Sequence, residues 1–259
     1  MPSSIPSATD HDLLARLDRN FRLASAETFA SSEIGEALKT RDVHCVMCPL
    51  AEFNWAFLKF PNCDAEKAVD RAERYYGERE LPFRLIVRSD LAAATGAADI
   101  LANRGHIPVG DPTPGMSIQP LGTTPAPPEG LEIRRVDGET SLAQFSHTVF
   151  AGFGIPTRFS EKFLTADLLA SPEAALFVGY VEDEPVATTM MIATGDVAGI
   201  YWVATLEDHR RRGYAEALTW AGLAAGRELG CRVGSLQASA MGRPVYARMG
   251  FGHTADYVY

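Results

Sequence analysis

The chain has 259 residues, which is enough for one large domain or two ordinary ones. Its composition, 46% hydrophobic and 22% charged, is that of a folded globular protein. The net charge of −9 at pH 7 argues against nucleic acid or an anionic membrane as the main partner, because both require a basic surface. No apolar run approaches the ~20 residues of a membrane span, and residues 1–10 lack the apolar core of a signal peptide. We therefore expect a cytoplasmic protein.

The cysteines favour reduced thiols over a disulfide framework, because Cys45, Cys48, Cys63 and Cys231 are too few and too scattered. Cys45 and Cys48 form a CxxC beside His44, so a zinc or redox site is one interpretation. The surrounding segment has the pattern of a buried strand, however, and no second CxxC completes a set of four ligands. We expect both thiols to pack as small core residues, and we expect no metal.

The first half of the chain predicts alternating strands and helices. Its aromatic and β-branched runs predict strands over 53–60 and 84–88, and helical spacing predicts a helix over 65–76. Six prolines then lie between residues 111 and 130, where Pro argues against a helix interior or a central strand. Residues 115–119 are compatible with a last strand of the first half. We therefore expect a first domain over 1–121, a Pro-rich linker over 122–130 and a second domain over 131–259.

The second half predicts a strand, two helices, three strands, a helix, a strand, a helix and a short final strand. Two apolar runs flank an acidic turn at 182–185 and predict a hairpin. The expected strands cover 131–136, 175–181, 186–193, 199–205 and 233–238, and the expected helices begin near 140, 160, 215 and 242.

The run Arg210-Arg211-Arg212-Gly213-Tyr214-Ala215 lies between an apolar strand and an amphipathic helix. A helix N-terminus has unpaired N–H groups and carries about half a positive charge, so it attracts anions. Gly213 lets the backbone approach a ligand closely, and the small Ala215 keeps the first turn open. The loop therefore predicts a site for the pyrophosphate of an anionic cofactor.

The run Arg210-x-x-Gly213-x-Ala215 resembles the acetyl-CoA signature of the GNAT superfamily of acyl-CoA-dependent N-acetyltransferases. Further along, Tyr246-Ala247-Arg248-Met249-Gly250-Phe251 resembles the family's Tyr-x-x-x-Gly-Phe segment after the fifth strand. Both motifs occur in order on a matching plan of elements over about residues 131–259. The resemblance implies an α/β (α+β) fold with a mixed, mostly antiparallel sheet flanked by helices.

The resemblance also implies roles for individual residues. The donor acetyl-CoA would lie between the fourth and fifth strands, with its pantetheine arm against the backbone of Val203, Ala204 and Thr205. Its pyrophosphate would bind N–H groups of residues 211–215. The N–H of Val203 is a candidate for stabilising the oxyanion. Tyr246 matches the position that protonates the departing thiolate; the alternative is that it only packs against the cofactor.

The general base is less defined. Some family members place a glutamate on the fourth strand, and the equivalent position here is Gly199. Tyr201 lies two residues along on the same strand face, where it would either relay a proton through water or simply shape the cleft. His209 is a weaker candidate, since it is more typical of an exposed loop. The acceptor pocket is expected near the helices that carry Phe145, Phe150, Phe153, Phe159 and Phe163, although most of these should be core residues.

The first half looks like a degenerate copy of the second, which would make the chain two tandem GNAT-like domains. Its run Leu101-Ala102-Asn103-Arg104-Gly105-His106 parallels the segment at Tyr246. In place of the arginine and glycine loop it has Pro61-Asn62-Cys63-Asp64, which has no glycine and ends in a carboxylate. This loop should repel a pyrophosphate. We expect the first half to have a structural role, either covering one side of the acceptor cleft or forming a homodimer.

The function that the sequence favours is transfer of an acetyl group from acetyl-CoA to a primary amine of a small molecule or peptide. The main alternative is a non-catalytic acyl-CoA-binding or regulatory module, because the glutamate is missing at Gly199. A peptidoglycan-type aminoacyl transferase also uses paired domains of this kind, but the intact acetyl-CoA signature counts against it. Because a fold does not fix a function, the sequence does not identify the acceptor.

Overall fold

The structure is a computed structural model that describes residues 8–59 and 63–258. The elements of the first half are α1 (Ala8–Ala30), β1 (Glu36–Lys39), β2 (Val43–Met47), η1 (Ala51–Phe53), β3 (Trp55–Leu58), α2 (Ala65–Gly77), β4 (Arg84–Arg88), α3 (Ser89–Ala94), α4 (Ala97–Asn103) and β5 (Thr113–Ile118). Those of the second half are β6 (Glu132–Arg135), α5 (Glu139–Phe153), η2 (Thr157–Lys162), α6 (Ala166–Leu169), β7 (Ala174–Val181), β8 (Glu184–Thr194), β9 (Val197–Thr205), η3 (Glu207–His209), α7 (Tyr214–Glu228), β10 (Val233–Gln237), α8 (Arg243–Arg248) and β11 (Gly252–Val258).

The second half follows the predicted order of elements, with one difference. The helix expected from residue 160 to 169 is divided into the short helices η2 and α6. Between them, the backbone N–H and the hydroxyl of Thr165 both donate to the carbonyl of Ser31, at 3.1 and 2.7 Å. A continuous helix would use that N–H internally, so docking onto the end of α1 interrupts it.

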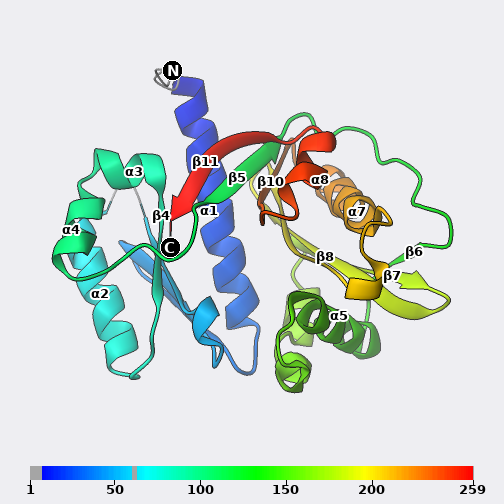
Figure 1. The fold of residues 1–259 in the computed structure, drawn as a ribbon, viewed down its shortest axis with the longest axis horizontal. Helices are drawn as coiled ribbons and strands as arrows, with labels where there is room; N and C mark the ends of the chain where they lie inside the picture. Colours follow the sequence, from blue (N-terminus) through cyan, green and yellow to red (C-terminus); the bar gives the residue numbers. More distant parts are fainter. Residues whose placement is uncertain (1–7, 60–62, 259) are drawn as a thin grey trace.

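Helix α1 is the longest of the elements that the sequence did not predict. It crosses the middle of the molecule and packs against β1 and β2 of the first half and β8 and β9 of the second (Figure 1). Because it is covered on several sides, polar residues such as Asp18, Asn20 and Thr28 are buried along with its apolar ones. The helix therefore lacks the single apolar stripe by which an amphipathic helix is recognised.

One sheet of eleven strands runs through both halves in the order β1-β2-β3-β4-β11-β5-β10-β9-β8-β7-β6. Strand β5, expected as the last strand of the first half, pairs with β10, and the C-terminal β11 pairs with β4. The two strands also pair with each other and lie side by side at the centre of the molecule (Figure 1). The two halves thus exchange strands. The division of the chain into two domains with a linker at residues 122–130 stays a prediction.

The strand pairs are antiparallel except for one parallel pair in each half, β3 with β4 and β9 with β10. This gives the mixed, mostly antiparallel sheet flanked by helices that the sequence predicts. The main core is shared, since Phe21 and Phe29 of α1 belong to the same buried cluster as Phe145 and Phe150 of α5. Among the described residues, no helix combines the length and apolar character needed to span a membrane.

Candidate functional site

Strands β9 and β10 separate partway along their length. They pair in parallel at three positions, which end with Ser235 opposite Gly199. The rest of β9, from Ile200 to Thr205, extends beyond this pairing. A strand edge released in this way offers backbone donors and acceptors to an extended ligand.

A bulge in β9 lies within the separated part. The pairing with β8 shifts register between Thr188 and Met190, and Trp202 adopts a φ of 50°. The hydroxyl of Thr188 donates to the Trp202 carbonyl at 2.9 Å and so holds the bulge. A bulge re-aims the side chains and peptide groups next to it, and left-handed backbone at a bulky residue is strained.

The arginine and glycine loop leads from β9 into α7, as the sequence predicts. Gly213 is the N-cap of α7, with a φ of 79°, and no side chain caps the helix. Arg211 also has left-handed backbone, with a φ of 63°. Because the first N–H groups of α7 have no side-chain cap, the helix end is open to an anion.

The three arginines of this loop have different partners. Arg210 donates from Nε to the Thr205 carbonyl at 3.2 Å and from Nη2 to the Gly152 carbonyl at 3.1 Å, which ties the loop to β9 and α5. Arg212 donates to the Asp208 carbonyl at 3.0 Å. Arg211 makes no such bond within the described residues and lines the cavity beside the loop. Arg210 therefore holds the loop in place, and Arg211 is the arginine whose charge is available.

A cavity of about 470 Å³, here called the loop cavity, lies between the end of β9, the start of α7 and α8. Three arginines line it, Arg210, Arg211 and Arg248, against the single carboxylate of Glu216. The other lining residues are Gly152, Phe153, Val203, Ala204, Thr205, His209, Gly213, Tyr214, Ala215, Ser239, Met241, Gly242, Pro244, Val245 and Tyr246. Of the predicted cofactor-binding residues, all except Arg212 line this cavity. The sequence did not predict that the segment from Ser239 to Pro244 lines the cavity, because this segment has no run of charged residues to indicate a binding site.

A second cavity of about 310 Å³, here called the inter-half pocket, adjoins the first. The two share Phe153, Val203, Ser239 and Tyr246. The other residues lining the inter-half pocket are Phe21, Ala24, Ser25, Thr28, Phe29, Phe53, Trp55, Thr113, Ile200, Tyr201, Trp202, Leu236 and Gln237. Both halves of the chain therefore build it.

The expected phenylalanine cluster supplies only one residue to this pocket. Phe153 lines it and is 52% exposed, whereas Phe145 and Phe150 are fully buried in the core. The remaining aromatic residues of the lining come from α1, η1, β3, β9 and α8. The sequence could not place α1 beside β9, because the residues in contact are far apart in the chain. The hydrogen bond between Asn20 and Tyr201, for example, joins residues about 180 positions apart.

Tyr246 lies where the two cavities meet. Its side chain is 8% exposed, and burial raises the pKa of its phenol to about 12, opposed by a hydrogen bond with Thr219. The hydroxyl therefore stays protonated throughout the neutral range, as a proton donor must. His209 also lines the loop cavity and has a buried Nδ1 without a partner among the described residues.

Tyr201 and Gly199 have a partner from the first half. The Tyr201 hydroxyl donates to Asn20 Oδ1 at 2.5 Å, and burial raises the pKa of the phenol. A Cβ at Gly199 would overlap Asn20 Oδ1 and lie 2.6 Å from the Tyr201 hydroxyl. Asn20 thus fills the space that a longer side chain at Gly199 would need. This geometry favours Tyr201 as a wall of the pocket over Tyr201 as a proton relay.

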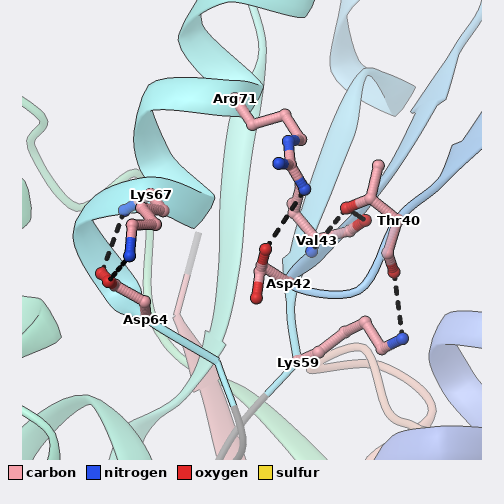
Figure 2. A network of polar contacts seen from close by, with 7 residues as sticks. All are labelled: Thr40, Asp42, Val43, Lys59, Asp64, Lys67 and Arg71. Carbon is pink, nitrogen blue, oxygen red and sulfur yellow. Dashed lines mark hydrogen bonds and ion pairs between the residues drawn. The ribbon is translucent and has the colours of Figure 1, made fainter.

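The equivalent region of the first half is closed to an anion. Asp64 caps α2 by accepting from the Lys67 N–H, and its carboxylate pairs with Lys67 Nζ at 2.8 Å. Beside it, Arg71 pairs with Asp42, and Lys59 donates to the Thr40 carbonyl, so Lys67 and Arg71 are matched by carboxylates and Lys59 by a backbone oxygen (Figure 2). Pro61 and Asn62 of the predicted degenerate loop lie outside the described residues.

The CxxC cysteines are buried and free. Burial raises the pKa of Cys45 to about 12 and that of Cys48 to about 11, which keeps both thiols protonated. Within residues 8–59 and 63–258, no group of three or more His, Cys, Asp or Glu is placed to hold a metal ion.

Comparison with known proteins gives a family match for the second half. Residues 143–251 match the model of the acetyltransferase (GNAT) family. A search of curated proteins finds no significant sequence match.

Solved structures resemble the chain along nearly its full length. A GCN5-related N-acetyltransferase from Kribbella flavida has a TM-score of 0.66 at 18% identity, over 93% of each chain. Another from Sphaerobacter thermophilus has a TM-score of 0.61 at 18% identity, over 98% of this chain and 92% of that one. A tandem GNAT protein from the clavulanic acid biosynthesis pathway has a TM-score of 0.62 at 13% identity, over 99% and 88%. This likeness confirms the predicted tandem GNAT-like fold.

Proposed function

We propose that this chain transfers an acetyl group from acetyl-CoA to a primary amine of a small molecule or peptide, since residues 143–251 match the model of the acetyltransferase (GNAT) family. The observation that carries the proposal is the uncapped N-terminus of α7, which opens into a cavity that meets a second cavity at Tyr246. One cavity suits an anionic donor and the other an acceptor. Their junction is where the reacting groups would meet.

In this proposal the pyrophosphate binds the loop N–H groups of residues 211–215, with the side chain of Arg211 adding charge. Arg210 acts indirectly, because its guanidinium holds the loop against Thr205 and Gly152. The pantetheine arm extends along the free edge of β9 and pairs with the backbone of Val203, Ala204 and Thr205. The parting of β9 from β10 supports this path, since it leaves that edge unpaired.

The chemical step is attack of a neutral amine nitrogen on the thioester carbonyl. The N–C bond forms, and the developing oxyanion would accept a hydrogen bond from the Val203 N–H, next to the bulge at Trp202. The C–S bond then breaks, and Tyr246 donates its phenolic proton to the departing thiolate. The nitrogen loses its surplus proton to water, and water returns a proton to the Tyr246 phenolate, so the net products are the amide and the CoA thiol. Holding both reactants in two adjoining cavities supplies the alignment on which such a transfer depends.

The second candidate is a non-catalytic acyl-CoA-binding module. It is favoured by the inter-half pocket, whose described lining residues include no carboxylate that would act as a general base.

Two measurements separate these candidates. Calorimetric titration with acetyl-CoA tests the donor site, and both candidates predict saturable binding. Release of free CoA thiol in the presence of a panel of primary amines tests the transfer. Binding without release from any amine would support the binding module, and absence of binding at high micromolar acetyl-CoA would reject both.

A further inference from the structure

The inter-half pocket has an aromatic lining that comes from separate parts of the chain. Trp55 of β3 lies with its ring centroid 6.2 Å from Phe21 and 6.3 Å from Phe29, both of α1. Phe53 lies 5.6 Å from Trp55 and 5.5 Å from Trp202 of β9, so it connects the two tryptophans. Rings at these separations favour a further aromatic ring over a flexible polar chain, because they offer faces and edges for stacking.

The lining is also uncharged. Among the described residues that form the pocket there is no Asp, Glu, Lys, Arg or His. A polyamine or aminoglycoside would bring several ammonium groups into this pocket without a counter-charge, and burying unpaired charges is costly. A single amine can avoid this cost by losing its proton, since desolvation lowers the pKa of an amine. The pocket would thus deliver the neutral nucleophile without a carboxylate base.

Several polar side chains also line the pocket, and two of them come from different halves. Ser25 of α1 and Gln237 of β10 both line it, and neither side chain has a hydrogen-bond partner within the described residues. Thr28, by contrast, donates to the Ala24 carbonyl at 2.8 Å. Ser25 and Gln237 therefore remain available to bind a polar substituent or the amine itself.

We propose that the inter-half pocket binds an arylalkyl primary amine, that is, a single amino group on a short chain from an aromatic ring. The inference rests on the proposed function, because the pocket opens onto the loop cavity at Tyr246. It also gives the first half a role: α1, η1 and β3 form the part of the pocket that selects the acceptor. The N-terminus of α2, which Asp64 caps, takes no part in binding the acceptor.

Tryptophan fluorescence provides a direct test of binding. Two of the three tryptophans, Trp55 and Trp202, line the pocket, whereas Trp220 packs against Gly122 elsewhere. The probes are 2-phenylethylamine, n-hexylamine and spermidine, each titrated into the full chain with and without CoA. We expect a saturable signal with 2-phenylethylamine and affinity at least about tenfold weaker for the other two. Equal affinities, or tighter binding of spermidine or n-hexylamine, would overturn the inference.

A pair of variants controls for folding. Trp55→Leu removes a ring of the pocket, and Phe83→Leu removes a ring of the first half that stacks on Tyr76 outside it. Calorimetry with 2-phenylethylamine should show about tenfold weaker binding for Trp55→Leu and no change for Phe83→Leu. Equal losses in both variants would contradict the role of the pocket. Thermal melts establish that each variant is folded.

Acetyl-CoA measurements keep this inference separate from the proposed function. If the chain binds 2-phenylethylamine but neither binds acetyl-CoA nor releases CoA, the transferase proposal fails while the pocket inference holds. If acetyl-CoA is bound and n-hexylamine or spermidine is acetylated with the higher kcat/KM, the transferase proposal holds and the pocket inference fails.

Discussion

Asn20 joins the first half of the chain to the strand that carries the site, and its removal should have a large effect. Its side chain is completely buried. It donates to the carbonyls of Ile192 and Val197, at 3.0 and 3.4 Å, and accepts from the Tyr201 hydroxyl at 2.5 Å. The substitution Asn20→Ala removes all three bonds. It also leaves the Tyr201 hydroxyl in a space from which water is largely excluded.

The expected cost follows from these contacts. Each hydrogen bond is worth about 1 kcal/mol of net stability, so Asn20→Ala should lower the free energy of unfolding by about 3 kcal/mol. In a protein of this size that corresponds to a fall in Tm of about 6–12 °C. Tyr201→Phe removes one bond and should cost about 1–2 kcal/mol. Asn103→Ala, an exposed change on α4, serves as the control and should stay within about 0.5 kcal/mol.

Urea denaturation followed by fluorescence measures the free energies of unfolding, and CoA release measures turnover. If Tyr201 is a wall of the pocket, Tyr201→Phe should keep turnover within about threefold of the parent. A loss of about a hundredfold would instead assign Tyr201 to proton transfer. A cost for Asn20→Ala within about 1 kcal/mol of the Asn103→Ala control would refute the role given to Asn20.

Three further predictions concern the loop cavity and the core. Tyr246→Phe should lower kcat by about a hundredfold and leave the Kd for acetyl-CoA nearly unchanged, as steady-state kinetics and calorimetry would show; unchanged kcat would reject Tyr246 as the acid. Gly213→Val forces a branched residue into a φ of 79° and should weaken acetyl-CoA binding by about tenfold, whereas Gly252→Val, at an open position of ordinary φ, should not. Burial, with Arg22, Lys39 and Lys59 nearby, lowers the pKa of His44 to about 4, so its contribution to stability is present above about pH 6.5 and is lost as the pH falls towards 4. In thermal melts over that pH range, the Tm of His44→Leu should fall less than the Tm of the parent chain. An identical pH dependence in the two proteins would contradict this role of His44.

Much of the second half was predictable from local pattern. The strands β6–β10 and the helices α5, α7 and α8 follow hydrophobic periodicity and turn residues, which are properties of neighbouring positions. The loop at Gly213 was recognisable because a positive φ at a helix start favours glycine. The closed helix end of the first half was partly foreseeable too, since Asp64 is a strong N-cap residue and a poor neighbour for an anion.

Other features depend on contacts between distant residues. The exchange of β5 and β11 between the halves cannot be inferred from either strand alone, because register and partner are set by the assembled sheet. Helix α1 was missed since its polar residues are buried by both halves and hide its periodicity. The aromatic lining was expected from the helices before the hairpin, but only Phe153 comes from them; half of the aromatic residues come from the first half, and the others from β9 and α8.

The sequence by itself predicted the proposed donor side of this protein, because the motifs at Arg210 and Tyr246 are short and local, and helix termini attract anions wherever they occur. Only the tertiary structure brings together the residues of the proposed acceptor side. It placed Asn20 against Gly199 and Tyr201, and it brought Trp55 and Trp202 into the lining of one pocket. Those contacts arise from the packing of α1 and β3 against β9, which no pattern within a single segment records.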